Sequence, residues 1–361
     1  MTIVGERADG KEPTLQVGEI YVRHESLRYD DKGRDYFRRD VMVGDESNRD
    51  PNRHRRFLEL GNHFEQLVRD NPSWQTKVRD GIVTGVDGNK AAEWLYYDED
   101  HRPTQMLEWA GKFPTAIALE PLQRLENGGK WLSAGGLDQR SLDYFTYMVD
   151  GIGLRARARV YTERLVTLAG DRDSLTVVSL GSGAAVPNID ATQRLESLNK
   201  RVDWKFYDTN PEALLYAQKL VAEKNFQYST FDFGPTALNK KTNISEPTGR
   251  SFARAFGQVP DGSVDVVDAL GLWEYLSEDT ARRFFEKLYP KIKPGGSMIV
   301  SNMLPDRPQK EFNQRAVGWP GLYLRGDTDL LDIVSKAGID SANVTMTHTN
   351  DGVYGVMEIK R

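Results

Sequence analysis

The second half of the chain alternates strand-like and helical segments, and this alternation constrains the fold more than any other feature of the sequence. Short apolar runs, typical of buried strands, occupy Thr176 to Leu180, Asp203 to Tyr207, Val264 to Ala269 and Ser297 to Ser301. Amphipathic helical patterns separate them at Pro211 to Glu223 and Asp279 to Leu288. Strands that alternate with helices form parallel sheets with helices on both faces. The pattern therefore predicts a doubly wound α/β fold.

The chain ends in a predicted hairpin. Two strand-like runs, Val344 to His348 and Val353 to Ile359, flank the turn sequence Thr349-Asn350-Asp351-Gly352. Such a turn joins antiparallel neighbours, so we expect one antiparallel strand at the end of the parallel sheet.

The first part of the sequence has a different pattern. Apolar residues from Arg55 onward recur at helical spacing until Asn71, and further helical pieces follow. The first fifty residues are polar and predict an irregular arm with one strand at Leu15 to Arg23. We expect residues 1–150 to form a mostly helical region that covers the sheet edge or a substrate cleft, and residues 151–361 to form the α/β domain.

Composition excludes several classes of protein. The 361 residues include no cysteine, which rules out disulfides and thiolate metal sites, and no two of the five histidines are four residues apart, so no metal site is expected. The net charge of −5 disfavours nucleic acid as a partner. No apolar run approaches the ~20 residues that span a bilayer, and the N-terminus lacks the apolar core of a signal peptide. We therefore expect a cytoplasmic protein without membrane insertion that acts on a small molecule; nothing in the sequence indicates its oligomeric state.

A glycine-rich turn follows the first of the predicted strands. The run Val177-Val178-Ser179-Leu180-Gly181-Ser182-Gly183-Ala184-Ala185 places two glycines where a backbone can approach a ligand closely. Asp208 ends the next strand, where a carboxylate can accept both hydroxyl protons of a ribose. Both features suit a nicotinamide nucleotide as well as S-adenosylmethionine. The absence of G-x-G-x-x-G, the Lys293-Pro294-Gly295-Gly296 turn and the terminal hairpin favour S-adenosylmethionine.

From about Asp150 to Ile339, the sequence resembles the seven-stranded, Rossmann-like methyltransferases that use S-adenosylmethionine. The matching motifs are Ser179 to Ala185, Asp208, Val264 to Leu270, and Leu288 to Val300. A finer similarity is to the bacterial branch named for making the methyl ester of 3-hydroxypalmitic acid, through Gly271 to Leu276, Ser301 to Met303, and Tyr323 to Arg325. Most members of the wider family have an acid and a glycine where this chain has Ser179 and Ala185.

The resemblance implies a seven-stranded Rossmann-like sheet with an antiparallel last strand, and a set of cofactor-binding residues. These are Leu180, Gly181, Ser182, Gly183, Asp208, Thr209, Asp232, Phe233, Ala269 and Leu270. Arg155 is expected to bind the carboxylate of the cofactor, because a guanidinium matches two carboxylate oxygens. Two plainer alternatives stay open, a helix N-cap for Asp208 and a solvated helix face for Arg155 with Arg157 and Arg159.

Four residues are expected at the methyl acceptor, namely Glu274, Tyr275, Tyr323 and Arg325. The resemblance implies a methyltransferase for a small or medium-sized acceptor, which we expect to be a carboxylic acid oriented by Arg325 beside Tyr323. A hydroxyl or amine acceptor would instead need a base such as Glu274. The alternatives for the function are an N- or hydroxyl O-methyltransferase and a protein that binds the cofactor without catalysis. The alternative for Glu274 and Tyr275 is a purely structural role in helix packing.

Overall fold

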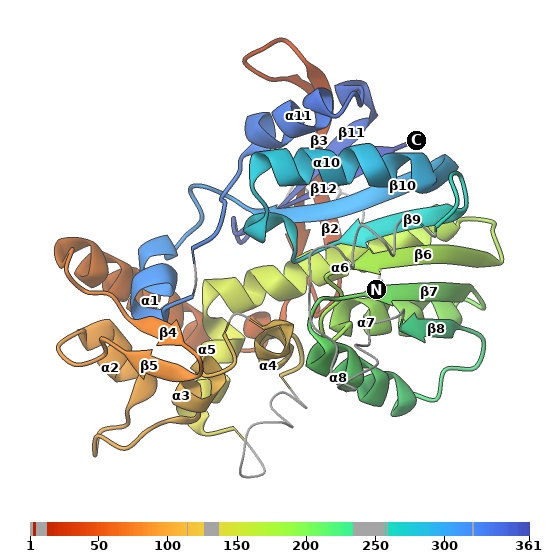
Figure 1. Cartoon of the computed structure of the whole chain (residues 1–361). Coiled ribbons are helices and arrows are strands. Elements are labelled where there is room, and N and C mark those ends of the chain that lie inside the picture. Colours follow the sequence, from red (N-terminus) through yellow and green to blue (C-terminus); the bar gives the residue numbers. More distant parts are fainter. Residues whose placement is uncertain are drawn as a thin grey trace, which may run out of the picture.

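One ten-stranded sheet organises the protein (Figure 1). The structure, a computed structural model, describes residues 3–4, 13–113, 115–125, 137–233, 257, 259–319 and 321–361. The strands of this sheet are β1 (Ile3–Val4), β2 (Ile20–Tyr29), β3 (Asp35–Val43), β6 (Ser174–Leu180), β7 (Arg201–Tyr207), β8 (Thr230–Phe233), β9 (Val264–Ala269), β10 (Ile292–Met303), β11 (Val344–Thr349) and β12 (Tyr354–Lys360). A separate small hairpin consists of β4 (Lys77–Arg79) and β5 (Ile82–Thr84).

The helices fall into two groups along the chain. Those before the α/β part are η1 (Glu46–Arg49), α1 (Pro51–Asp70), α2 (Lys90–Tyr96), α3 (Gln105–Ala110), η2 (Ala116–Leu119), α4 (Glu120–Gln123) and α5 (Gln139–Tyr147). The later ones are α6 (Val149–Ala169), α7 (Val186–Glu196), α8 (Pro211–Ala222), η3 (Trp273–Tyr275), α10 (Glu278–Leu288), η4 (Tyr289–Lys291), η5 (Phe312–Val317), α11 (Asp327–Lys336) and η6 (Ser341–Asn343).

The sheet has ten strands where the resemblance implied seven, and its α/β part has the order β8-β7-β6-β9-β10-β12-β11. β12 runs antiparallel to both β10 and β11, whereas β6 to β10 pair in parallel, so the antiparallel last strand is confirmed. Apolar side chains of α10 and α11 cover one face, and those of α6, α7 and α8 cover the other. The doubly wound α/β prediction is therefore correct for this part.

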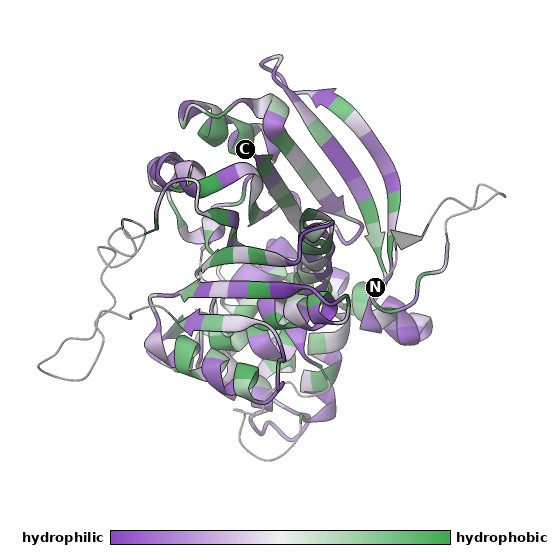
Figure 2. Ribbon diagram, turned by 90° about the vertical axis from the view of Figure 1, so that its right-hand side faces the viewer, coloured by the Kyte–Doolittle hydropathy of each residue, from purple (hydrophilic) through white to green (hydrophobic). Residues whose placement is uncertain are grey.

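The expectation of an irregular arm in the first fifty residues is wrong, although the single strand expected at Leu15 to Arg23 overlaps the start of β2. β2 and β3 form a long antiparallel hairpin, and β3 pairs in parallel with β11, which extends the seven strands to ten. Figure 2 shows hydrophilic residues interspersed along this curved hairpin. Most of β2 is exposed, with only its first two residues buried. The sequence pattern missed β3 and most of β2 because exposed or half-buried polar residues separate the few apolar ones, of which Ile20, Val41 and Val43 are buried in the core.

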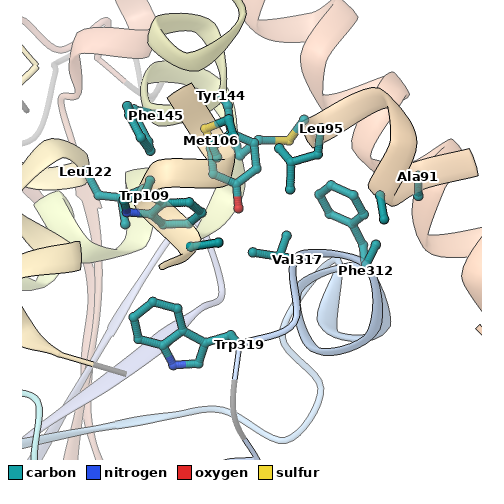
Figure 3. Close-up of a cluster of buried hydrophobic side chains, with 14 of the residues drawn as sticks. Ala91, Leu95, Met106, Trp109, Leu122, Tyr144, Phe145, Phe312, Val317 and Trp319 are labelled. Atoms are coloured by element: carbon teal, nitrogen blue, oxygen red, sulfur yellow. The ribbon is translucent and has the colours of Figure 1, made fainter. Parts of the chain in front are cut away.

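The helices of the N-terminal part lie beyond the carboxyl ends of the parallel strands (Figure 1). Their shared core is rich in aromatic residues and includes side chains of η5, as Figure 3 shows for Phe312 and Val317 beside Leu95. Trp109 is buried and donates from Nε1 to the carbonyl of Ala118, 2.6 Å away. The sequence predicted this helical cover, although the hairpin shows that residues 1–150 are not helical throughout.

Two glycines near the start of α6 lie within the helix and do not break it. The break lies at Met148, whose backbone is extended, and α6 runs through Gly151 and Gly153. A Cβ at Gly151 would lie 2.6 Å from the carbonyl oxygen of Phe145, and one at Gly153 would lie 2.6 Å from Val353 Cβ. These glycines permit close packing against neighbours. The boundary expected after residue 150 falls inside α6.

Candidate active site

The glycine-rich turn joins β6 to α7 at the carboxyl edge of the sheet. Gly181 and Gly183 have positive φ values of 58° and 56°, a region that side chains disfavour. Gly181 N donates to the carbonyl of Tyr207 at 2.8 Å. The turn is therefore held against the end of β7 by its own backbone.

Asp208 follows β7 and contacts this turn directly. Its Oδ2 accepts a hydrogen bond from Gly183 N at 2.7 Å, and its Oδ1 accepts one from Asn210 N at 2.8 Å. Burial raises the pKa of Asp208 above its ordinary value. The N-cap of α8 is Asn210, whose Oδ1 accepts from Glu212 N, so the plainer alternative for Asp208 does not hold.

The other residues expected at the cofactor lie at the carboxyl ends of adjacent strands. Leu180 ends β6 and Ala269 ends β9, both buried, and Leu270 follows. Thr209 and Asp232 are exposed at the ends of β7 and β8. Phe233 lies on the ring of Phe206, with ring centroids 5.1 Å apart. The fold thus brings the expected set to one edge, where open α/β sheets bind ligands.

A pocket, here called the turn pocket, opens between the glycine-rich turn and the N-terminal helices. Gly181, Ser182, Leu270, Arg157 and Ala116 belong to its lining. A Cβ at Gly183 would lie only 2.2 Å from Ala116 Cβ, so η2 rests on the turn. Among the described residues, neither Ser182 Oγ nor Arg157 Nε has a hydrogen-bond partner. The pocket offers polar atoms that a ligand could satisfy.

A buried hydrogen-bond network supports the turn from below. Asp268 near the end of β9 accepts from Ser179 Oγ and Tyr161 Oη, each at 2.7 Å, and from Asn188 Nδ2 at 3.3 Å. Burial raises the pKa of Asp268 to about 7, against the effect of these three donors. Ser179 stands where most members of the wider family have an acid. Here Asp268 of the neighbouring strand β9 supplies a carboxylate next to that position.

Arg155 has a structural role rather than the predicted cofactor contact. Its side chain is 2% exposed and forms an ion pair with Asp45, with Nε 2.7 Å from Oδ2 and Nη2 2.8 Å from Oδ1. The remaining N–H groups donate, each at 2.8 Å, to the carbonyls of Leu122, Phe145 and Thr146. All five donors are used, so none is left for a cofactor carboxylate. The solvated-face alternative is equally wrong for this residue.

Arg157, two residues further along α6, faces the site instead. It lines the turn pocket, donates to the carbonyl of Leu270 and lies over the ring of Tyr354, 4.5 Å from its centroid. Its Nη1 is 3.7 Å from Glu274 Oε1. A guanidinium stacked on a ring and left with an unpaired Nε is well placed to receive an anion.

A second pocket, here called the aromatic pocket, adjoins the turn pocket. Its aromatic residues are Trp109, Tyr144, Tyr275, Trp319 and Tyr354, and its polar ones are Asp150, Arg157, Glu274 and Asn313. Figure 3 shows Trp109, Tyr144 and Trp319 converging from separate segments of the chain. Leu119, Arg157 and Gly271 line both pockets, so the two pockets share a wall.

Glu274 and Tyr275, which the sequence predicts at the methyl acceptor, both line the aromatic pocket. The Glu274 side chain is buried, and burial raises its pKa to about 7 although the charge of Arg157 opposes this. Its Oε2 has no hydrogen-bond partner among the described residues. Tyr275 Oη lies 3.2 Å from Trp319 Nε1, which donates to it.

Tyr323 and Arg325 lie outside this pocket, contrary to expectation. Tyr323 is 52% exposed, and its backbone N–H donates to the carbonyl of Glu274 at 2.8 Å. Arg325 is buried and donates to the carbonyl of Trp273 at 2.9 Å and to that of Leu276 at 2.5 Å. Neither side chain lines the aromatic pocket. The Arg325 guanidinium is held away from it by hydrogen bonds to backbone carbonyls around η3.

Several site residues were missed by the sequence analysis. Trp109, Tyr144, Trp319 and Tyr354 come from distant segments, and no local pattern distinguishes them from core residues. Asp268 left a signal, because an acid inside the apolar run Val264 to Ala269 needs a buried partner. Arg157 was considered beside Arg155, but only tertiary structure decides which of the two faces the site.

The described part of the chain contains no cluster of three or more His, Asp or Glu side chains that could hold a metal ion. In that same part, none of the helices combines the length and the apolar character needed to span a membrane.

No family model matches this chain, and a comparison with curated proteins finds no match. Among solved structures, it is similar to a possible exported protein from Bordetella parapertussis, with a TM-score of 0.55, 14% identity, and coverage of 85% of this chain and 96% of that chain. This likeness concerns the fold alone.

Several of the similar solved structures are methyltransferases. Magnesium protoporphyrin IX methyltransferase from Synechocystis PCC 6803 has a TM-score of 0.43 and 16% identity, with coverage of 63% of this chain and 90% of that chain. Human N-acetylserotonin methyltransferase has a TM-score of 0.40 and 13% identity, with coverage of 71% and 70%. These scores are too low to carry a functional argument for the present chain.

Proposed function

We propose that the protein is an S-adenosylmethionine-dependent methyltransferase that binds its cofactor in the turn pocket and its acceptor in the aromatic pocket. The observation that carries this proposal is the wall shared by the two pockets at the carboxyl edge of the sheet. A methyl donor above the glycine-rich turn and an acceptor among the rings would meet there. Methyl transfer needs this alignment above all, since the bound cofactor supplies a methyl group on a positively charged sulfur that is already a good leaving group.

The residues of the turn pocket, and those that lie outside its lining at the carboxyl ends of β7 and β8, are chemically suited to this cofactor. In the proposal, Asp208 accepts the ribose hydroxyls through its remaining lone pairs, and Asp232 and Phe233 contact the adenine. Arg157 takes the role first expected of Arg155 and binds the cofactor carboxylate through its unpaired Nε–H. The predicted Leu180–Gly183 and Ala269–Leu270 segments supply the backbone walls.

The N-terminal helices cover the proposed site. Ala116 packs against the glycine-rich turn, and Leu119 lines both pockets. Excluding water from the reacting atoms strengthens the electrostatic interactions inside the site and prevents hydrolysis. A small or medium-sized acceptor suits such an enclosed pocket. The narrower prediction of a carboxylic acid oriented by Arg325 receives no support, because that guanidinium does not line the pocket.

Calorimetry with S-adenosylhomocysteine and with NAD tests the cofactor. We expect S-adenosylhomocysteine to bind with a Kd of roughly micromolar size, about −8 kcal/mol, and NAD to give no heat. Absence of S-adenosylhomocysteine binding would refute the proposal. Transfer of labelled methyl groups to a metabolite extract then separates an enzyme from a protein that only binds the cofactor. As a control, the variant Lys205→Met changes a side chain outside both pockets and should bind S-adenosylhomocysteine as the wild type does.

A further inference from the structure

Resting on the proposed function, we propose that the acceptor is a neutral ring compound with a phenolic hydroxyl, bound in the aromatic pocket, and that Glu274 removes its proton. The branch that the sequence resembles would instead place a fatty carboxylic acid here. Three properties of the pocket carry the inference: its rings, its charges and the unpaired oxygen of Glu274.

The rings favour a planar acceptor. Trp109 and Trp319 have ring centroids 6.4 Å apart and planes 33° apart, and Tyr144 lies 5.6 Å from Trp109. Tyr275 is tied to Trp319 by the Nε1 donor described above. Aromatic rings gain most from offset or edge-to-face contact with another ring, whereas an alkyl chain gains only burial. A lining so rich in rings therefore selects a ring compound.

The charges favour a neutral acceptor. Glu274 faces Arg157 of α6 on one side, and Arg325 contributes a second positive charge from the segment before α11. The phenol groups of Tyr275 and Tyr354 face the same carboxylate. Asp150 is paired with Arg307, which leaves the pocket close to neutral. In the proposed function Arg157 is engaged by the cofactor carboxylate and Asp150 by Arg307, so an acceptor carboxylate would lie beside Glu274 with no free cation among the described residues that line the pocket, which costs free energy in a buried site.

Glu274 is suited to a phenol in particular. A base is most effective when its pKa lies near the working pH, and burial raises the pKa of Glu274 to about 7. A phenol ionises near pH 10, about three units above this carboxylate, whereas an aliphatic hydroxyl ionises far higher, near the value for water of about 16. The carboxylate can therefore assist ionisation of a phenol but not of an alkanol.

The proposed step moves one proton to Glu274 and one methyl group to the acceptor oxygen. Glu274 Oε2 accepts the phenolic proton as the phenol oxygen forms a bond to the methyl carbon. The bond between that carbon and the cofactor sulfur breaks, and its electron pair stays on sulfur. The products are an aryl methyl ether, S-adenosylhomocysteine and a protonated Glu274, which releases its proton to water after the products leave.

The test compares three probes with one ring system: 2-naphthol, 2-naphthoic acid and 2-naphthylamine, with hexadecanoic acid as a fourth. Binding is measured by calorimetry on protein saturated with S-adenosylhomocysteine, and turnover by labelled methyl transfer. We expect 2-naphthol to bind at least about tenfold more tightly than the two acids and to yield 2-methoxynaphthalene. Trp319→Leu should weaken 2-naphthol binding about two- to tenfold, the size of a lost ring contact.

The base is tested by Glu274→Gln, which keeps the shape of the side chain. We expect kcat to fall roughly 100-fold or more while the Kd for 2-naphthol changes less than about fivefold, since general base catalysis contributes about that factor. The wild-type rate should rise through about pH 7 and level off, and the variant should lose this rise. Glu286→Gln, on the exposed face of α10, is the matched control and should change neither quantity.

Other outcomes are decisive in different ways. Tighter binding of either acid, or no binding of 2-naphthol by protein that does bind S-adenosylhomocysteine, would overturn the phenol inference and leave the proposed function standing. Preferred methylation of 2-naphthylamine would overturn it in favour of an N-methyltransferase. Loss of S-adenosylhomocysteine binding by the unaltered protein is a failure of the proposed function itself.

Discussion

Replacing Arg155 by methionine should unfold the protein more readily without directly weakening cofactor binding. The guanidinium is buried, pairs with Asp45 and satisfies three backbone carbonyls. Removing one partner of a buried ion pair costs about 3–5 kcal/mol. Each carbonyl that loses its donor adds about 1 kcal/mol. Arg159 still lies 2.9 Å from Asp45 and offsets part of this loss. We expect a decrease of about 4–6 kcal/mol in the free energy of unfolding.

Urea unfolding followed by circular dichroism measures this decrease. A double-mutant cycle with Asp45→Asn isolates the pair, because the double variant should lose less than the sum of the two single changes, by about 2 kcal/mol. Arg201→Met removes an exposed arginine that pairs with Asp203 at 3.1 Å, and this control should cost less than about 1 kcal/mol.

Calorimetry with S-adenosylhomocysteine, under conditions where Arg155→Met is folded, distinguishes the structural role from the cofactor role. The affinity should stay within about threefold of the wild type, whereas Arg157→Met should lose about tenfold or more, as expected when a charged hydrogen bond is removed. A stable Arg155→Met protein with strongly weakened cofactor binding would refute the reasoning and restore the prediction made from sequence.

Three further changes test the turn. Asp208→Ala should weaken S-adenosylhomocysteine binding by well over tenfold in calorimetry, about 2 kcal/mol or more, and an unchanged Kd would contradict the cofactor site. Gly183→Ala should cost at least about 1–2 kcal/mol from its positive φ alone, with a further cost because the new Cβ meets Ala116 at 2.2 Å; an unfolding midpoint in urea equal to that of the wild type would count against this packing. Asp268 has a folded-state pKa raised by burial from 3.8 to about 7, so its protonated form stabilises the fold at low pH and this contribution is lost as the pH rises through about 7. The stability of the wild type relative to Asp268→Asn should therefore fall between about pH 4 and pH 7 in urea unfolding, and a difference independent of pH would contradict the assignment.

The sequence by itself determined the α/β part, because its strands and helices carry their own periodicity. The run Thr176 to Leu180 is mostly apolar since both faces of its strand are covered, and the turn at Gly181 and Gly183 has a local conformational requirement. The terminal hairpin likewise follows from its turn residues. The same local signals placed Asp208 directly after the strand that ends at Tyr207, and Glu274 shortly after the strand that ends at Ala269.

Tertiary structure alone decided the rest, because those features depend on partners distant in sequence. The hairpin of β2 and β3 joins the sheet because β3 pairs with β11, about 300 residues away along the chain, and polar residues interrupt the few apolar ones in both strands. Arg155 and Arg157 are equivalent in sequence, but a rotation of about 200° along the helix turns one toward Asp45 and the other toward Glu274. The aromatic pocket forms only when α3, α5, η5 and β12 meet, since each ring separately is an ordinary core residue.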